Sequence, residues 1–276
     1  MAKSMRTAYA ETLIELGGTN DKVVVMDADL GHTTMSCLFQ EKYPDRHFNF
    51  GIAEANMVCG ATGFAKAGLI PFVSTMAMFG VGRAFEQIRN TVCYVNANVK
   101  FGLSHPGISV GADGGSHQTV EDIAIMRCLP NMRILAPCDS IQMRKAVLAA
   151  AEMEGPVYIR VSRPDVENVT TEEMPFVPGK AQLLRKGKDV CIMATGLMVH
   201  IALMAADIVI AILDGLRHAA VLAGRPQNAA VRPQIAAIVK KVAGVFAERD
   251  TVQDLDKPLE QIERAVHGLY GNQSSN

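Results

Sequence analysis

The chain has 276 residues, of which 49% are hydrophobic and 20% are charged, a balance typical of a globular protein of one or two domains rather than a disordered or fibrous one. Its 27 basic and 28 acidic side chains give a formal net charge of -1, so the chain lacks the positive field that binding to nucleic acids or anionic membranes requires. The N-terminal residues lack the apolar core of a signal peptide, and no apolar run approaches the roughly 18 residues of a membrane span, so we expect a cytoplasmic protein.

The first half of the chain alternates between helical and strand patterns. Residues 6–18 carry apolar positions at helical spacing and end at two glycines, and the β-branched run that follows stops at Asp27 and Asp29. The same alternation predicts helices near 54–68, 82–96 and 139–153, and strands near 70–76, 99–105, 131–137 and 155–163. This order predicts an α/β fold, with a mostly parallel sheet and helices on both faces.

Ligands of such sheets gather beyond the carboxyl ends of the strands. Four polar residues follow predicted strands directly and are candidates on that ground, although strand ends also turn toward water in proteins without a site: Asp27, Asp29, His105 and Arg163.

A Pro- and Thr-rich segment interrupts the alternation after residue 163. We therefore predict a first domain over residues 1–166, a linker over 167–180 and a second region over 181–276. Residues 189–210 predict a strand, a glycine turn and a helix, as at the start of a further α/β domain. No clear strand follows, so we expect an incomplete or divergent C-terminal α/β or helical segment, helical after about residue 207, with a frayed tail.

The glycine-rich loop over residues 104–122 concentrates chemistry-bearing side chains. Its glycines let the backbone approach a ligand, and His105, Asp113 and His117 offer donors and acceptors suited to a polyhydroxylated substrate. A zinc site or a surface loop without a role are the alternatives, but no metal-binding spacing of histidines or cysteines accompanies the loop. The GVGRAF stretch at 80–85 lacks the final glycine of a dinucleotide-binding fingerprint.

Glu54 stands alone among apolar and small residues in the stretch FNFGIAEANMVCGA, residues 48–61. A carboxylate is costly to bury without a partner. Either Glu54 lies on a solvated face or at a helix N-terminus, where the dipole stabilises it, or a specific partner is present.

Six motifs in order carry a resemblance to a known family: DADL, FNFGIAEANM, STMAMFGVGRAFEQIRN, SHPGISVGADGGSHQT, LAPCDS and PVYIRVSRP. Over about residues 5–206 the chain resembles the pyrimidine-binding half of the thiamine-diphosphate-dependent transketolase family, especially the short C-terminal subunit of split transketolases. The resemblance implies the thiamine-diphosphate-binding pyrimidine domain and a transferase.

The resemblance assigns Glu54 to the ring nitrogen N1′ of the cofactor's aminopyrimidine, and a carboxyl in an apolar pocket can share a proton with such a nitrogen. It places Asp29 near the thiazolium ring and Phe79 on the face of the aminopyrimidine. Met76 stands where the family commonly has a second phenylalanine and can pack through its sulfur. Gly82 stands where many full-length transketolases have tyrosine.

The resemblance also implies the catalytic residues, which are Glu54, His105 and His117, and the residues that contact the substrate. It places His105, Asp113 and His117 on hydroxyls of the sugar, and Arg163, His105, Thr33 and Arg6 on its terminal phosphate, an anion that a planar guanidinium suits.

The family's G-D-G motif, which binds the diphosphate and Mg²⁺, is absent from the chain, so we expect no metal ligands here and only half of an active site. The resemblance implies a small transketolase subunit that transfers a two-carbon ketol unit between sugar phosphates. It would act with an N-terminal subunit that carries the diphosphate and Mg²⁺ site, in a heterotetramer, and be inactive alone. The alternatives are a deoxyxylulose-phosphate synthase-like chain, a 2-oxoacid dehydrogenase β-type subunit and a non-catalytic assembly subunit.

Overall fold

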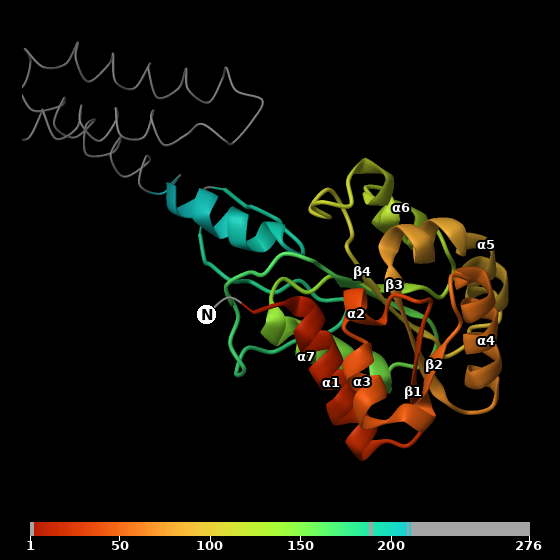
Figure 1. Cartoon of the computed structure of the whole chain (residues 1–276). Helices are drawn as coiled ribbons and strands as arrows, with labels where there is room; N and C mark the ends of the chain where they lie inside the picture. The colour runs from red at the N-terminus through yellow and green to blue at the C-terminus, as the bar shows by residue number, and fades with distance from the viewer. Residues whose placement is uncertain (1–2, 188–189, 209, 211–276) are drawn as a thin grey trace, which may run out of the picture. The chain divides into compact units, whose positions relative to one another are not determined.

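The computed structural model describes residues 3–187, 190–208 and 210 (Figure 1). The chain forms two compact units, Met1–Ala202 and Leu203–Asn276. Every labelled helix and strand below lies in the first unit. In the described part of the chain, no helix is both long and apolar enough to cross a membrane.

Six parallel strands form one sheet in the order β2-β1-β3-β4-β6-β5. The register aligns the carboxyl ends: Asp27 lies opposite Asn49 and Ser74, and Ser104 lies opposite Met76 and Val161. The predicted α/β fold is confirmed. The strands are β1 (Val23–Asp27), β2 (His47–Asn49), β3 (Ile70–Met76), β4 (Lys100–Ser104), β5 (Arg133–Leu135) and β6 (Val157–Val161).

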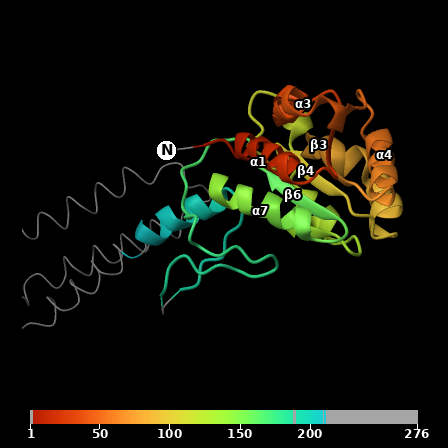
Figure 2. The same ribbon diagram turned by 90° about the horizontal axis from the view of Figure 1, so that it is seen from below.

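Helices cover both faces of this sheet (Figures 1 and 2). The longer helices are α1 (Met5–Thr19), α4 (Glu54–Lys66) and α7 (Ser140–Glu152), and the short ones are α2 (Gly31–Thr34), α3 (Cys37–Lys42), α5 (Phe85–Gln87) and α6 (Asp122–Arg127). The 3₁₀ turns are η1 (Pro44–Arg46) and η4 (Gly115–His117).

Alternating strand residues divide the core into two layers. Val23 and Val25 of β1 pack with α1, α3 and α7, whereas Val24 and Met26 pack with α4 and α6. This follows from the two-residue period of a strand, which sends neighbouring side chains to opposite faces. The strand is buried along its whole length, as the parallel fold requires.

The helix predicted over residues 82–96 does not form as one regular helix. Two segments with wide, π-helical turns, η2 (Met78–Arg83) and η3 (Ile88–Cys93), flank the short α5. A Cβ atom at Gly80 would lie 2.7 Å from the Leu103 side chain, so the backbone of η2 packs directly on β4. This close contact with the sheet is set by tertiary packing, which overrides the helical pattern.

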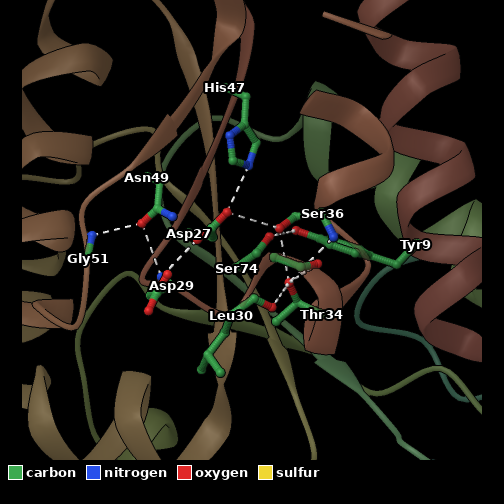
Figure 3. A network of polar contacts seen from close by, with 11 residues as sticks. Tyr9, Asp27, Asp29, Leu30, Thr34, Ser36, His47, Asn49, Gly51 and Ser74 are labelled. Carbon is green, nitrogen blue, oxygen red and sulfur yellow. Dashed lines mark hydrogen bonds and ion pairs between the residues drawn. The ribbon is translucent and has the colours of Figure 1, made fainter. Parts of the chain in front are cut away.

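Glycine also brings α1 onto the sheet. A Cβ atom at Gly102, in the middle of β4, would come within 2.2 Å of the Tyr9 ring, and the Tyr9 hydroxyl lies 2.9 Å from Ser74 Oγ (Figure 3). The buried ring therefore holds α1 against β3 and β4 and fixes the position of Arg6 on the same helix.

The strand predicted at the start of residues 189–210 is wrong within the described part, because residues 190–195 form no strand. Val190 is 65% and Met193 is 91% exposed, and none of the described strands pairs with this apolar run. Residues 198–208 are helical as predicted. The segment expected to be helical after about residue 207 lies almost wholly outside the described residues, and the domain boundaries stay predictions.

Candidate active site

Five strands deliver side chains to one edge of the sheet. Asp29 follows β1, Glu54 follows β2, Phe79 follows β3, His105 follows β4 and Arg163 follows β6. Because all the strands are parallel, their carboxyl ends meet at the same edge. The topology thereby gathers residues that are far apart in the sequence.

Glu54 begins α4 and is 1% exposed. Its Oε2 atom lies 2.8 Å from Nη1 of Arg83, whose side chain is 49% exposed. The buried carboxylate thus has a specific cationic partner as well as a favourable position at a helix N-terminus. Sequence reasoning did not single out Arg83. The one sequence signal for such a residue was that a buried carboxylate needs a cationic partner.

Arg83 also links Glu54 to an aromatic residue. The guanidinium carbon lies 4.7 Å from the centre of the Phe79 ring, and that ring meets His117 edge to face at 5.4 Å. Glu54, Arg83, Phe79 and His117 form a continuous row along the carboxyl edge, which we call the acid-aromatic row. The row connects α4, η2 and the glycine-rich loop.

His105 follows β4, the strand next to β3, at the same edge. The residue is 2% exposed, with a φ of 60°, and its Nδ1 atom lies 2.9 Å from Ser104 Oγ. Burial, followed by the nearby cations Arg6 and Arg163, lowers the pKa of His105 to about 4. The imidazole is therefore neutral near pH 7, where it can accept one hydrogen bond and donate another.

Two guanidinium groups converge beside His105. Arg6 donates from Nη1 to the backbone oxygen of Thr33 at 2.9 Å, and Arg163 donates to the backbone oxygen of Val110. Burial and the charge of Arg163 lower the pKa of Arg6. Its buried Nε atom has no hydrogen-bond partner within the described residues. Paired cations with an unused donor make this corner suited to an anion.

The glycine-rich loop adds the remaining predicted polar side chains. Asp113 is exposed, and His117, at the end of η4, is partly buried. Electrostatic effects of both residues reach His105, with Asp113 raising and His117 lowering the pKa of that imidazole. Asp113 and His117 therefore lie within electrostatic range of His105.

Three predicted residues are placed at the edge without joining these groups through a side-chain interaction in the described structure. Asp29 is exposed, with a φ of 61°, and only its backbone N–H is engaged, with Asp27 Oδ1 at 2.9 Å and Asn49 Oδ1 at 3.1 Å (Figure 3). Met76 is buried at the end of β3. Thr33 takes part through its carbonyl oxygen rather than its hydroxyl.

Asp27, which the sequence suggested as a candidate because it follows a strand, has a structural role in the site. It is 1% exposed, and its Oδ2 atom lies 2.9 Å from Nε2 of the buried His47 (Figure 3). The Nδ1 atom of His47 has no hydrogen-bond partner among the residues that the structure describes. Asp27 therefore fixes the backbone of Asp29 and is itself shielded from ligands.

Asp122 is a further buried acid, and sequence reasoning did not identify it as a site residue. Its Oδ2 atom accepts hydrogen bonds from the Tyr158 hydroxyl and from Arg160 Nε, both at 2.7 Å. An antiparallel bridge between Gly107 and Thr119 closes the glycine-rich loop on itself. These contacts fasten the loop to β6 and hold its histidines in place.

No group of three or more His, Cys, Asp or Glu side chains in the described ranges could hold a metal ion. The donor set of a zinc site is therefore not assembled in this part of the chain.

Comparison with known proteins identifies the relatives of this arrangement. Residues 1–168 match the family described as "Transketolase, pyrimidine binding domain". The chain is 44% identical over 241 residues to a "Putative transketolase C-terminal section" of Methanocaldococcus jannaschii, covering 87% of this chain and 74% of that protein. It is 40% identical over 203 residues to the "6-deoxy-6-sulfo-D-fructose transketolase subunit SqwH" of a Clostridium species, and the match covers 74% of this chain and 63% of that protein.

Among solved structures, the chain resembles one titled "Split gene transketolase, inactive beta4 tetramer". The TM-score is 0.70 at 47% identity, over 76% of this chain and 69% of that one. The region that matches the family model, residues 1–168, includes the six-stranded sheet and the loops at its carboxyl edge.

Proposed function

Because this chain belongs to the transketolase family and carries its pyrimidine-binding domain, we propose that it is the small subunit of a thiamine-diphosphate-dependent transketolase. Together with a diphosphate-binding large subunit, it transfers a two-carbon ketol unit between sugar phosphates. The observation that carries this proposal is the buried carboxyl of Glu54 in the acid-aromatic row beside Phe79.

The residues of the row fit the aminopyrimidine of thiamine diphosphate. Phe79 offers an aromatic face for a flat heterocycle, and Glu54 holds its carboxyl away from water, as a proton shared with a ring nitrogen requires. Met76 would pack beside the ring, and Asp29 would offset the positive charge of the thiazolium. When bound, the cofactor supplies the electron sink for cleaving and forming the carbon–carbon bond.

The substrate contacts follow from the groups around His105. A neutral imidazole on His105, together with His117 and Asp113, would bind sugar hydroxyls and guide proton transfer. Arg6 and Arg163 would bind the terminal phosphate. The Nε atom of Arg6, which no described residue engages in a hydrogen bond, supports that assignment.

A partner completes the site. The chain carries no G-D-G motif, so Mg²⁺ and the diphosphate would be held by an N-terminal transketolase subunit, in a heterotetramer of the two kinds of chain. A location in the cytoplasm belongs to the same proposal.

The test combines the chain with the large subunit of a split transketolase, thiamine diphosphate, Mg²⁺, a ketose phosphate and an aldose phosphate. We expect ketol transfer only when both subunits are present. The variant Glu54→Gln should lower kcat by about 10²- to 10⁴-fold, the usual contribution of a positioned acid-base group. Glu86→Gln, at an exposed glutamate, serves as the matched control.

Full activity of Glu54→Gln would contradict the proposed role of the carboxyl. Turnover of a 2-oxoacid instead of sugar phosphates would favour the synthase-like or dehydrogenase-type alternatives. Calorimetric assembly with the large subunit, without any turnover, would support a non-catalytic subunit.

A further inference from the structure

One flat cation fills the middle of the acid-aromatic row. The Arg83 guanidinium pairs with Glu54 through a contact of 2.8 Å and lies over the Phe79 ring at 4.7 Å. In the described part of the chain, its ion pair with Glu54 is the only one that Arg83 forms. Arg83 thus engages both groups that the proposed function assigns to the cofactor ring.

A guanidinium and an aminopyrimidine make the same kinds of contact. Both are planar, both stack on an aromatic face, and both present nitrogen atoms to a carboxyl group in their own plane. Two such groups cannot occupy the Phe79 face and the Glu54 carboxylate together. Binding of the ring therefore requires the guanidinium to leave.

The position of Arg83 allows this movement. Its side chain is 49% exposed, so the charged group reaches water without crossing the core. Arg83 is the last residue of η2, whose wide turns depart from a regular helix. Glu54, in contrast, is buried and begins a regular helix, so it stays in place.

We infer that Arg83 is a latch on the empty pyrimidine site: its guanidinium neutralises Glu54 and covers Phe79 until the aminopyrimidine of the cofactor displaces it. This inference rests on the proposed function. The ion pair stabilises only the empty site, so it weakens cofactor binding by the free energy needed to break it.

The binding test uses the full chain and two probes, thiamine and 4-amino-5-hydroxymethyl-2-methylpyrimidine, with dissociation constants from ligand-observed NMR titrations. Arg83→Met keeps the apolar part of the side chain and removes the charge. Since a partly exposed ion pair need no longer be broken, we expect it to bind both probes about 3- to 10-fold more tightly than the unchanged chain. Arg89→Met, at an exposed arginine of η3, should bind like the unchanged chain.

Equal or weaker binding by Arg83→Met would overturn the latch, because an arginine that positions the ring would produce that result. If Arg83→Met gave that result and Glu54→Gln also lost probe binding, the latch would fail but the proposed function would stand. If no chain binds either probe saturably, the pyrimidine site and the latch both fail.

A second measurement needs no ligand. Urea unfolding of the unchanged chain, Arg83→Met, Glu54→Gln and the double variant forms a double-mutant cycle. The latch predicts that Arg83→Met lowers the free energy of unfolding when Glu54 is present. In the Glu54→Gln background, the same substitution should change that free energy little. Additive effects would show that the ion pair is absent in solution and would overturn the inference.

Discussion

His105 shows how one side chain takes its properties from its surroundings. Its ring is enclosed at the end of β4, with Arg6 and Arg163 near it. Burial and two positive charges both disfavour the imidazolium form. In the proposed site, a neutral ring can bind a hydroxyl next to a phosphate-binding corner without adding a third cation.

The depressed pKa of His105 predicts a pH dependence of stability. Its pKa falls from 6.5 to about 4 in the folded chain, so between these values the unfolded state binds more protons. The free energy of unfolding should therefore fall by about 2 kcal/mol from this group between pH 7 and pH 5. Urea unfolding at the two pH values should show that His105→Gln lacks this loss, whereas His32→Gln, at an exposed histidine, keeps it.

An NMR titration of the histidine rings gives an independent check. A His105 signal that titrates near pH 6.5 would contradict the argument, because it would mean that neither burial nor the two arginines act on the ring.

At the scale of elements, α7 and the segment after β6 share one buried carboxylate. Asp139 caps α7 by accepting from the N–H of Gln142 at 2.8 Å. It also accepts from the N–H groups of Val169 and Thr170 at 2.9 and 2.7 Å, and from the Thr170 hydroxyl. Asp139 thus ties the segment that follows Arg163 to the helix.

Removing this carboxylate should affect both elements. Asp139→Ala leaves buried N–H groups without acceptors, which we expect to lower the free energy of unfolding by roughly 2–4 kcal/mol. Urea unfolding measures the loss, and limited proteolysis should show faster cleavage near residues 165–174. Asp45→Ala, at an exposed aspartate of η1, is the control; an equal loss there would contradict the specific role of Asp139.

At the scale of the whole molecule, the parallel sheet assembles the proposed phosphate-binding site, which consists of Arg6 and Arg163 beside His105. Arg6 comes from α1 and Arg163 from the segment after β6, at the two ends of the pyrimidine-binding region. Only strands that all end at one edge, with α1 packed against them, bring these residues to His105.

Arg163→Gln should therefore alter substrate choice. Losing a charge-assisted hydrogen bond, worth about 1.5–3 kcal/mol, should raise KM roughly 10- to 100-fold for a phosphorylated ketose. KM for an unphosphorylated ketol donor should change little. Steady-state kinetics of the assembled complex measure both values, with Arg127→Gln, at an exposed arginine, as control. Equal effects on the two donors would contradict a phosphate contact.

The sequence by itself determined the alternation of elements, the parallel α/β class and the family, because apolar periodicity and short motifs are local properties. The same local signals placed Asp29, His105 and Arg163 after strands and marked Glu54 as a lone acid in an apolar stretch. Their roles in the site are proposals that the variants above test.

Tertiary structure alone decided which groups meet. Arg83 and Glu54 are 29 residues apart, and Asp122 and Tyr158 are 36 apart, so no local pattern pairs them. The wide turns around α5 and the missing strand at residues 190–195 have the same physical reason. Close packing and strand pairing depend on neighbours that are distant in the chain, and these override local preference.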